Sequence, residues 1–259
     1  MLLSVRKAVP ATTDPEKLDV VIIHGTGASS ELFVKQMELL ASQGYRVYMP
    51  DLRGHGETHE PGEHTDIDVH VSDLLETLTH SEVRFPAIFI GHSLGAIISI
   101  MMAERQPELF ERILAVSMPG RVPKLITTIF GWVFQLPLEK LRGSMIHRSL
   151  PKRTQVMLNT ERHSLQQIVN HFGSVDFVRS TPSVKVPVHF SVGRMDVVAP
   201  YNHVETMHRQ LPGSTLRIFE WSGHCCMEDQ PAMFNQWLLE TVGPQDPIEI
   251  KSPVGGYAV

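Results

Sequence analysis

A serine with the setting of a nucleophile lies at a corner between two apolar segments. Residues 86–95 read PAIFIGHSLG, and Ser93 has a glycine two residues away on each side. Residues 87–90 have the length and composition of a buried strand, and the apolar run 94–104 is long enough for a core helix. The corner predicts a strained serine whose hydroxyl stands clear of the sheet. At the start of the helix, the Leu94 N–H is free to donate to an oxyanion.

With its flanking strand and helix, this G-x-S-x-G run resembles the nucleophile elbow of the α/β-hydrolase family. The resemblance implies that Ser93 is the nucleophile and that the Leu94 N–H is one donor of the oxyanion hole. Taken alone, the pentapeptide also fits an ordinary glycine-rich turn with a capping serine. Three further motifs in the order of the family favour the hydrolase interpretation.

The first of these motifs follows the apolar run 18–24 (LDVVIIH), which predicts a strand covered on both faces. The run ends in His24-Gly25-Thr26-Gly27, where two glycines allow a tight turn that leaves the Thr26 N–H free to face a ligand. In the family an H-G-x-G loop supplies the second oxyanion donor, so the resemblance gives this role to Thr26. An ordinary glycine turn after a strand is the alternative.

An acid and a base follow two later strands. Residues 187–193 (PVHFSVG) predict a strand, and Asp196 follows in a G-x-x-D run, the place of the triad acid in the family. Residues 215–220 predict the last strand, and His224 stands just beyond it. Ser93, Asp196 and His224 thus occur in the chain order Ser, Asp, His of this fold. The alternative for Asp196 is a surface aspartate in a loop.

Residues 51–56 (DLRGHG) are similar to a segment that supports the oxyanion loop in the family, and we interpret them as structural. His55, His59 and His64, with glutamates between them, raise the alternative of a metal site. Glycine and proline residues interrupt the helix that would align these histidines, and the glutamates match no zinc-enzyme motif. We therefore expect neither a metal nor another cofactor.

The remaining pattern alternates strands and helices, which predicts an α/β fold with a mostly parallel sheet flanked by helices. Ligands of such sheets bind at the carboxyl ends of the strands, where His24 and Ser93 fall. No clear pair of strands precedes residue 18, so the antiparallel edge common in the family is expected to be shortened. The other predicted strands are 45–49 and 112–117, the predicted helices are 31–42, 66–80, 201–210 and 228–240, and the tail from Gly243 is predicted to be extended or mobile.

Residues 119–182 interrupt this alternation and predict a helical cap inserted into a hydrolase core of residues 1–118 and 183–259. From Arg121 to Pro182 there are nine basic and three acidic residues, which leaves 14 basic and 25 acidic residues, a net charge of −11, to the rest of the chain. Residues 125–138 carry no charge. Core packing explains them most simply; an acyl-binding wall or a lipid-facing edge of the cap is the alternative. On that alternative Phe130, Trp132 and Phe134 would contact substrate together with His92.

Composition sets the outer limits. A chain of 259 residues with 42% hydrophobic content can bury the core of a single domain, and a formal charge of −5 argues against nucleic acid as the main partner. The only cysteines, Cys225 and Cys226, fit a reducing compartment and are interpreted as packing residues. The apolar part of the first ten residues is too short for a signal peptide, so the expected location is the cytoplasm. Residues 85–103 approach membrane-spanning length, but the glycines and polar residues at their centre favour strand and helix.

The expected activity is hydrolysis of carboxylic esters, of the esterase or monoacylglycerol-lipase kind, through an acyl-enzyme on Ser93. A serine nucleophile argues against the epoxide-hydrolase and haloalkane-dehalogenase branches, which need a carboxylate. Two alternatives remain open: a hydrolase of carbon–carbon bonds in vinylogous diketones, and a small-molecule receptor or scaffold with negligible turnover. The expected partner is a small molecule with an apolar acyl part, with weak membrane-surface contact through the cap and an unknown oligomeric state.

Overall fold

The protein is built on a seven-stranded sheet in the order β1-β3-β2-β4-β5-β6-β7, seen in a computed structural model. It describes residues 1–10, 14–60, 62, 66–171, 176–181 and 183–244. Only β1 is antiparallel to its neighbour, and all other pairs are parallel. The strands are β1 (Val5–Ala8), β2 (Val20–Ile23), β3 (Val47–Pro50), β4 (Ala87–His92), β5 (Phe110–Val116), β6 (Val188–Gly193) and β7 (Thr215–Phe219).

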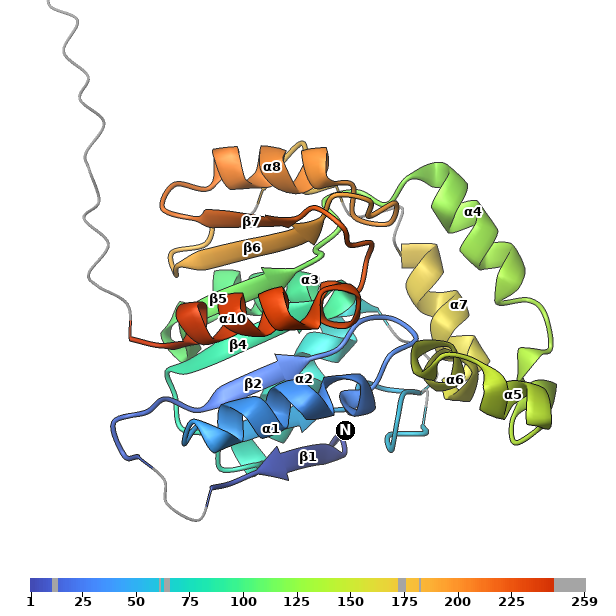
Figure 1. Cartoon of the computed structure of the whole chain (residues 1–259), viewed down its shortest axis with the longest axis horizontal. Helices are drawn as coiled ribbons and strands as arrows, with labels where there is room; N and C mark the ends of the chain where they lie inside the picture. The colour runs from blue at the N-terminus through green and yellow to red at the C-terminus, as the bar shows by residue number, and fades with distance from the viewer. Residues whose placement is uncertain (11–13, 61, 63–65, 172–175, 182, 245–259) are drawn as a thin grey trace, which may run out of the picture.

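Helices cover both faces of this sheet (Figure 1). Strands β2, β3, β4 and β6 are buried at every residue, as expected for parallel strands between two helical layers. One layer holds α1 and α10, and the other holds α2, α3 and α8. The helices of the core are η1 (Ser30–Phe33), α1 (Val34–Ser42), α2 (Ile67–His80), α3 (Leu94–Arg105), η2 (Pro107–Leu109), α8 (Tyr201–Gln210), α9 (Cys226–Asp229) and α10 (Pro231–Val242).

Between β5 and β6 the chain leaves the core and forms a group of short helices beside the carboxyl ends of the strands (Figure 1). Here Phe134, Leu165 and Ile168 belong to the same apolar cluster as α2 and α3, so this group packs onto the core. We call it the cap. Its helices are α4 (Lys124–Val133), η3 (Leu138–Leu141), α5 (Met145–Ser149), α6 (Lys152–Asn159) and α7 (Arg162–His171).

The predicted elements agree with the structure except at three places. Strand β1 was not predicted; it supplies one antiparallel edge strand before residue 18, pairing Val5 with Pro50 and Ala8 with Val47. The helix predicted over 31–42 begins with a 3-10 turn, η1. The closing helix predicted over 228–240 is divided into α9 and α10 because Pro231 begins the second helix.

None of the helices in the described part of the chain has the length and apolar character needed to cross a membrane. The apolar segment 85–103 forms β4 and most of α3, as the sequence predicted. Residues 245–259 of the predicted extended tail lie outside the described residues.

Candidate active site

Ser93 occupies the tight corner between β4 and α3. Its backbone has φ 53° and ψ −113°, a combination that costs a non-glycine residue about 1–3 kcal/mol. The Ser93 N–H bonds the Val116 carbonyl at 2.9 Å, and its own carbonyl accepts from Ala96 and Ile97, so the corner is fixed on both sides. The strained conformation predicted for this serine is therefore present, and the serine lies at the carboxyl edge of the sheet.

Glycines make this corner sterically possible. A Cβ atom on Gly91 would lie 2.5 Å from the Ala96 backbone, and one on Gly95 would lie 2.2 Å from the Ile23 carbonyl oxygen. Both contacts are with backbone atoms, which cannot move aside as a flexible side chain can. The two glycines therefore let α3 start directly against β4 and β2.

Asp196 and His224 are brought together by the loops after β6 and β7. The Asp196 Oδ2 atom lies 2.8 Å from His224 Nδ1, and the Asp196 carboxylate is buried. The second oxygen, Oδ1, accepts the N–H groups of Val198 and Ala199 at 2.9 and 2.8 Å. The aspartate is thus held as an acceptor that orients the imidazole. The Nε2 atom is left to exchange a proton with a hydroxyl group.

Gly193 allows these two loops to meet. A Cβ atom there would lie 2.2 Å from the Gly223 carbonyl oxygen and 2.3 Å from that of Ser222. Backbone bonds cross at the same place, from Arg194 N–H to the Phe219 carbonyl and from Met195 N–H to the Ser222 carbonyl. The acid and the base therefore have a common backbone support.

His92 lies behind the site, packed among backbone and ring atoms. It is buried, its Nε2 lies 2.9 Å from the His224 carbonyl oxygen, and its ring lies 4.9 Å from the His224 ring and 6.0 Å from that of Phe33. Burial lowers its pKa to about 3, so the ring is neutral and donates through Nε2–H. This placement favours a positioning role for His92 and gives no support to the predicted contact with substrate.

The loop predicted to carry the second oxyanion donor is braced by two buried histidines. His55 Nε2 accepts the Gly27 N–H at 3.0 Å, and His24 Nε2 accepts the Leu52 N–H at 3.0 Å. Each ring places Nδ1 against a carbonyl oxygen, that of Arg53 for His55 and that of Gly25 for His24. Burial lowers the pKa of both, which keeps them neutral in these roles. Within the described residues, neither the Thr26 nor the Leu94 N–H has an acceptor, so both can donate to a ligand.

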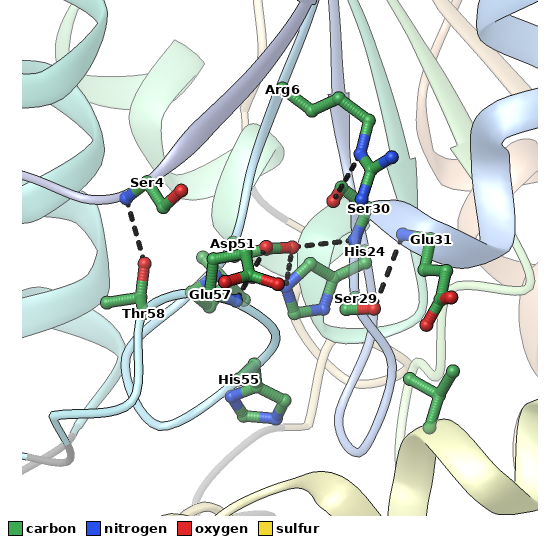
Figure 2. Close-up of polar contacts among 12 residues, drawn as sticks. Ser4, Arg6, His24, Ser29, Ser30, Glu31, Asp51, His55, Glu57 and Thr58 are labelled. Carbon is green, nitrogen blue, oxygen red and sulfur yellow. Dashed lines mark hydrogen bonds and ion pairs between the residues drawn. The ribbon is translucent and has the colours of Figure 1, made fainter.

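Asp51 connects the same loop to its neighbours (Figure 2). One carboxylate oxygen accepts the Ser30 N–H at 2.6 Å, and the other accepts the Glu57 N–H at 3.0 Å. Arg6 of β1 adds a bond to the Ser30 hydroxyl at 3.3 Å. The supporting role predicted for residues 51–56 is consistent with these contacts.

The histidines considered for a metal site differ in burial and in their contacts. His55 is buried and accepts the Gly27 N–H, His59 is exposed, and His64 lies outside the described residues. No group of three or more potential metal ligands was found in the described ranges.

The cap aromatic residues predicted to contact substrate point in different directions. Phe134 is buried and stacks on Phe130 with ring centres 5.7 Å apart, on the side facing α7 and the core. Trp132 is 66% exposed, so the expectation that it forms the same wall needs correction. In a helix, residues 130 and 134 share one side, whereas residue 132 projects from another.

Two features near His224 add to the sequence prediction. Cys226 is buried and Cys225 half-buried; burial raises the pKa of both thiols, that of Cys225 to about 12, which favours the packing interpretation. Asp229 was not singled out, yet its Oδ2 accepts the Gly223 N–H at 2.8 Å and the Ser222 hydroxyl at 3.2 Å. The sequence signal that could have identified Asp229 is its position as a carboxylate five residues after His224, which lies in a loop.

Comparison with known proteins agrees with this geometry. A family model described as serine aminopeptidase, S33, matches residues 14–231. A non-heme chloroperoxidase of Streptomyces lividans is 26% identical over 87% of this chain and 91% of its own. An esterase from Exiguobacterium antarcticum superposes with a TM-score of 0.79 at 20% identity, covering 93% of this chain and 95% of its own. A monoacylglycerol lipase from Paleococcus ferrophilus gives 0.70 at 21% identity, covering 93% and 98%.

The two solved structures share the fold, and the family model spans most of the chain. The elbow serine, the seven-stranded sheet and the inserted helices are all consistent with the α/β-hydrolase resemblance drawn from the sequence. The chain therefore belongs to the serine aminopeptidase S33 family of α/β hydrolases.

Proposed function

We propose that the protein is a serine hydrolase that cleaves carboxylic esters through an acyl-enzyme on Ser93. The observation that carries the proposal is the meeting, at one edge of the sheet, of a strained serine, an Asp196–His224 pair at 2.8 Å and two N–H groups without acceptors. Solved esterase and monoacylglycerol-lipase structures with the same fold support it.

Each step of this reaction has a residue that can perform it. His224, oriented by Asp196, accepts the Ser93 proton as the oxygen attacks the ester carbonyl carbon, and the Thr26 and Leu94 N–H groups bind the resulting oxyanion. The tetrahedral intermediate expels the alcohol, which takes the proton from His224. Water then gives a proton to His224 and attacks the acyl-enzyme carbonyl carbon. The second tetrahedral intermediate breaks its bond to Ser93 Oγ, which takes the proton back from His224, so the acid is released and the serine is restored.

The cap favours an ester over a peptide with a free amino terminus. A buried α-ammonium group needs a carboxylate partner, and the cap has an excess of positive charge. Its described carboxylates are already engaged: Glu161 accepts the Ser164 N–H, and Asp176 pairs with Arg121 and Arg179. A neutral ester therefore suits this cap better than a cationic substrate.

The acyl part is proposed to be apolar. The cap covers the oxyanion loop with Met157 and Leu165, whose side-chain atoms would lie 3.0 and 3.6 Å from a Cβ atom on Gly27. Each methylene buried there is worth about 0.8 kcal/mol, so each added carbon should raise kcat/KM several-fold until the space is filled. The two reduced cysteines fit our further proposal that the enzyme acts in the cytoplasm.

The test is a substrate panel with the wild-type protein and Ser93→Ala. It compares p-nitrophenyl esters of increasing acyl length, amino-acid p-nitroanilides and a vinylogous diketone. We expect ester hydrolysis that rises with chain length and is lost in Ser93→Ala. Turnover of the anilides or the diketone without ester hydrolysis would contradict the proposal, and so would saturable binding of esters without turnover.

A further inference from the structure

Helix α4 of the cap is apolar on two sides, but only one side is packed. Its inner side carries Phe130 and leads to Phe134, in the cluster that contains Leu165 of α7. The outer side carries Leu125, Ile129 and Trp132, which are 70%, 45% and 66% exposed. Their spacing of four and three residues places them together on one face. Neighbouring exposed apolar side chains of this size mark a surface that binds a partner or a membrane, so the outer face calls for a covering partner.

Helix α5, which follows η3 in the cap, also exposes apolar side chains. Met145 and Ile146 of α5 are 88% and 60% exposed. Helices α4 and α5 form the edge of the cap farthest from the sheet (Figure 1). We call these five side chains the cap patch: Leu125, Ile129, Trp132, Met145 and Ile146.

Cations without carboxylate partners accompany the cap patch. Lys124 directly precedes Leu125, and Lys140 and Arg148 lie on either side of Met145 and Ile146 in the chain; all three are exposed. Within the described residues none of these three cations forms an ion pair. Four of the other cap cations do so: Arg121 and Arg179 with Asp176, Lys152 with Glu31, and Arg153 with Asp229. Arg142 instead donates to the Leu158 and Thr160 carbonyls.

Charge also determines how the molecule would approach a surface. The cap segment has nine basic and three acidic residues, whereas the rest of the chain has a net charge of −11. An anionic surface would attract the cap and repel the core, which orients the cap patch towards it. A second copy of the same patch would instead meet like charges, which disfavours self-association through this face.

We propose that the cap patch docks onto an anionic lipid bilayer. Apolar side chains and a tryptophan enter the boundary between headgroups and acyl chains, where indole rings are favoured. Lys124, Lys140 and Arg148 lie beside the anionic headgroups, each worth about a fivefold gain in partitioning. The docking does not depend on Ser93 chemistry, so it can hold or fail independently of the proposed function.

The experiment measures co-sedimentation of the full chain carrying Ser93→Ala with vesicles of phosphatidylcholine alone or with about 30% phosphatidylserine. We expect binding that needs phosphatidylserine and weakens as salt rises from about 0.1 to about 0.5 M. Replacing Leu125, Ile129 and Trp132 together by serine should lower the partition coefficient at least about tenfold. Replacing Lys124, Lys140 and Arg148 together by glutamine should abolish the preference for the anionic lipid.

Val9→Ser is the matched control. Val9 is 58% exposed and follows β1, whose antiparallel direction places it at the end of the sheet away from the cap. This variant should bind vesicles like its parent. Circular dichroism checks that every variant is folded, which is expected because the altered side chains are exposed.

Three results would overturn the proposal. One is the absence of binding to either vesicle, and another is undiminished binding by the triple serine variant. The third is a concentration-dependent dimer that the triple serine variant loses, without vesicle binding by the parent; this would assign the cap patch to self-association.

Discussion

At the scale of single residues, the geometry around Ser93, Asp196 and His224 depends on three glycines. Gly91, Gly95 and Gly193 each lie where an added Cβ atom would meet backbone atoms at 2.2–2.5 Å. These close approaches bring the corner between β4 and α3, the end of β2 and the loop before His224 to one edge of the sheet. Gly131 of α4 differs, because a Cβ atom there would have no neighbour within 4 Å.

This contrast gives a paired prediction. Gly95→Ala should lower the free energy of unfolding by about 1–3 kcal/mol or more, because the Ile23 backbone cannot move aside. Gly131→Ala should raise it by about 0.5–1 kcal/mol, because alanine stabilises a helix interior. Urea unfolding of both variants measures the difference. Equal changes of the same sign in the unfolding free energy would show that the close approach at Gly95 does not determine the effect of an added Cβ atom.

His92 provides a second prediction at this scale. His92→Phe keeps an aromatic ring but removes the donor to the His224 carbonyl, which leaves a partly buried acceptor unsatisfied at a cost of about 1–2 kcal/mol. If that cost falls on the position of His224, kcat should fall about tenfold while KM changes little.

The check is steady-state kinetics on an ester, with thermal unfolding as the control for stability. An unchanged kcat in a folded His92→Phe protein would remove the positioning role. A rise in KM alone would restore the substrate contact that the sequence first suggested.

At the scale of elements, the cap is tied to the core beside both halves of the site. Lys152 of α6 pairs with Glu31 of η1, which follows the loop 24–27. Arg153 Nη1 lies 3.8 Å from Oδ1 of Asp229, the residue that supports the loop before His224. Asp229 therefore faces the cap with one oxygen and the histidine loop with the other.

Two substitutions of Asp229 separate these contacts. Asp229→Asn keeps an acceptor for the Gly223 N–H but loses the ion pair, which is long and partly exposed and so worth little. Its kcat should stay within about threefold of the parent. Asp229→Ala loses both contacts, and removing the charge-assisted bond should lower kcat about tenfold or more. Similar kinetics for the two variants would mean that the loop holds its shape without Asp229.

Elements also show how far the sequence could predict this protein. Ser93 and Asp196 could be found because they follow long apolar strands, and His224 because it follows the alternating strand 215–219, with all three in the motif order of the resembled family. Strand β1 could not be found in the same way: Val5–Ala8 has four residues, none buried, and it is defined by pairing with β3 some forty residues away. The bond from His92 to the His224 backbone and the outward side of Trp132 depend on contacts between distant segments, which local patterns do not contain.

At the scale of the whole molecule, buried neutral histidines link stability to pH. Burial lowers the pKa of His70 and His189 to about 4 and that of His92 to about 3. In the unfolded chain these groups titrate near 6.5, so below that pH the unfolded state binds more protons than the folded state. Stability is therefore complete above about pH 6.5 and falls towards pH 4, by about 1.4 kcal/mol per pH unit for each such histidine.

His70 isolates one part of this effect. Neither of its ring nitrogens has a hydrogen-bond partner among the described residues. His70→Leu should therefore keep the fold and reduce the slope of unfolding free energy against pH by about 1.4 kcal/mol per unit between pH 6 and 4. Denaturant unfolding at several pH values measures this slope. A slope equal to that of the parent would show that His70 is not neutral in the folded protein or not protonated on unfolding.

Labelling by a fluorophosphonate, with the modified peptide identified by mass spectrometry, tests whether Ser93 is the nucleophile. Ester turnover is followed in the same sample. We expect one label per chain, on Ser93, with turnover lost in proportion to labelling. The Ser93→Ala protein should take no label and lose about three orders of magnitude or more in kcat. A label on another residue, or ester turnover that survives in a folded Ser93→Ala protein, would contradict the role of Ser93 as the nucleophile.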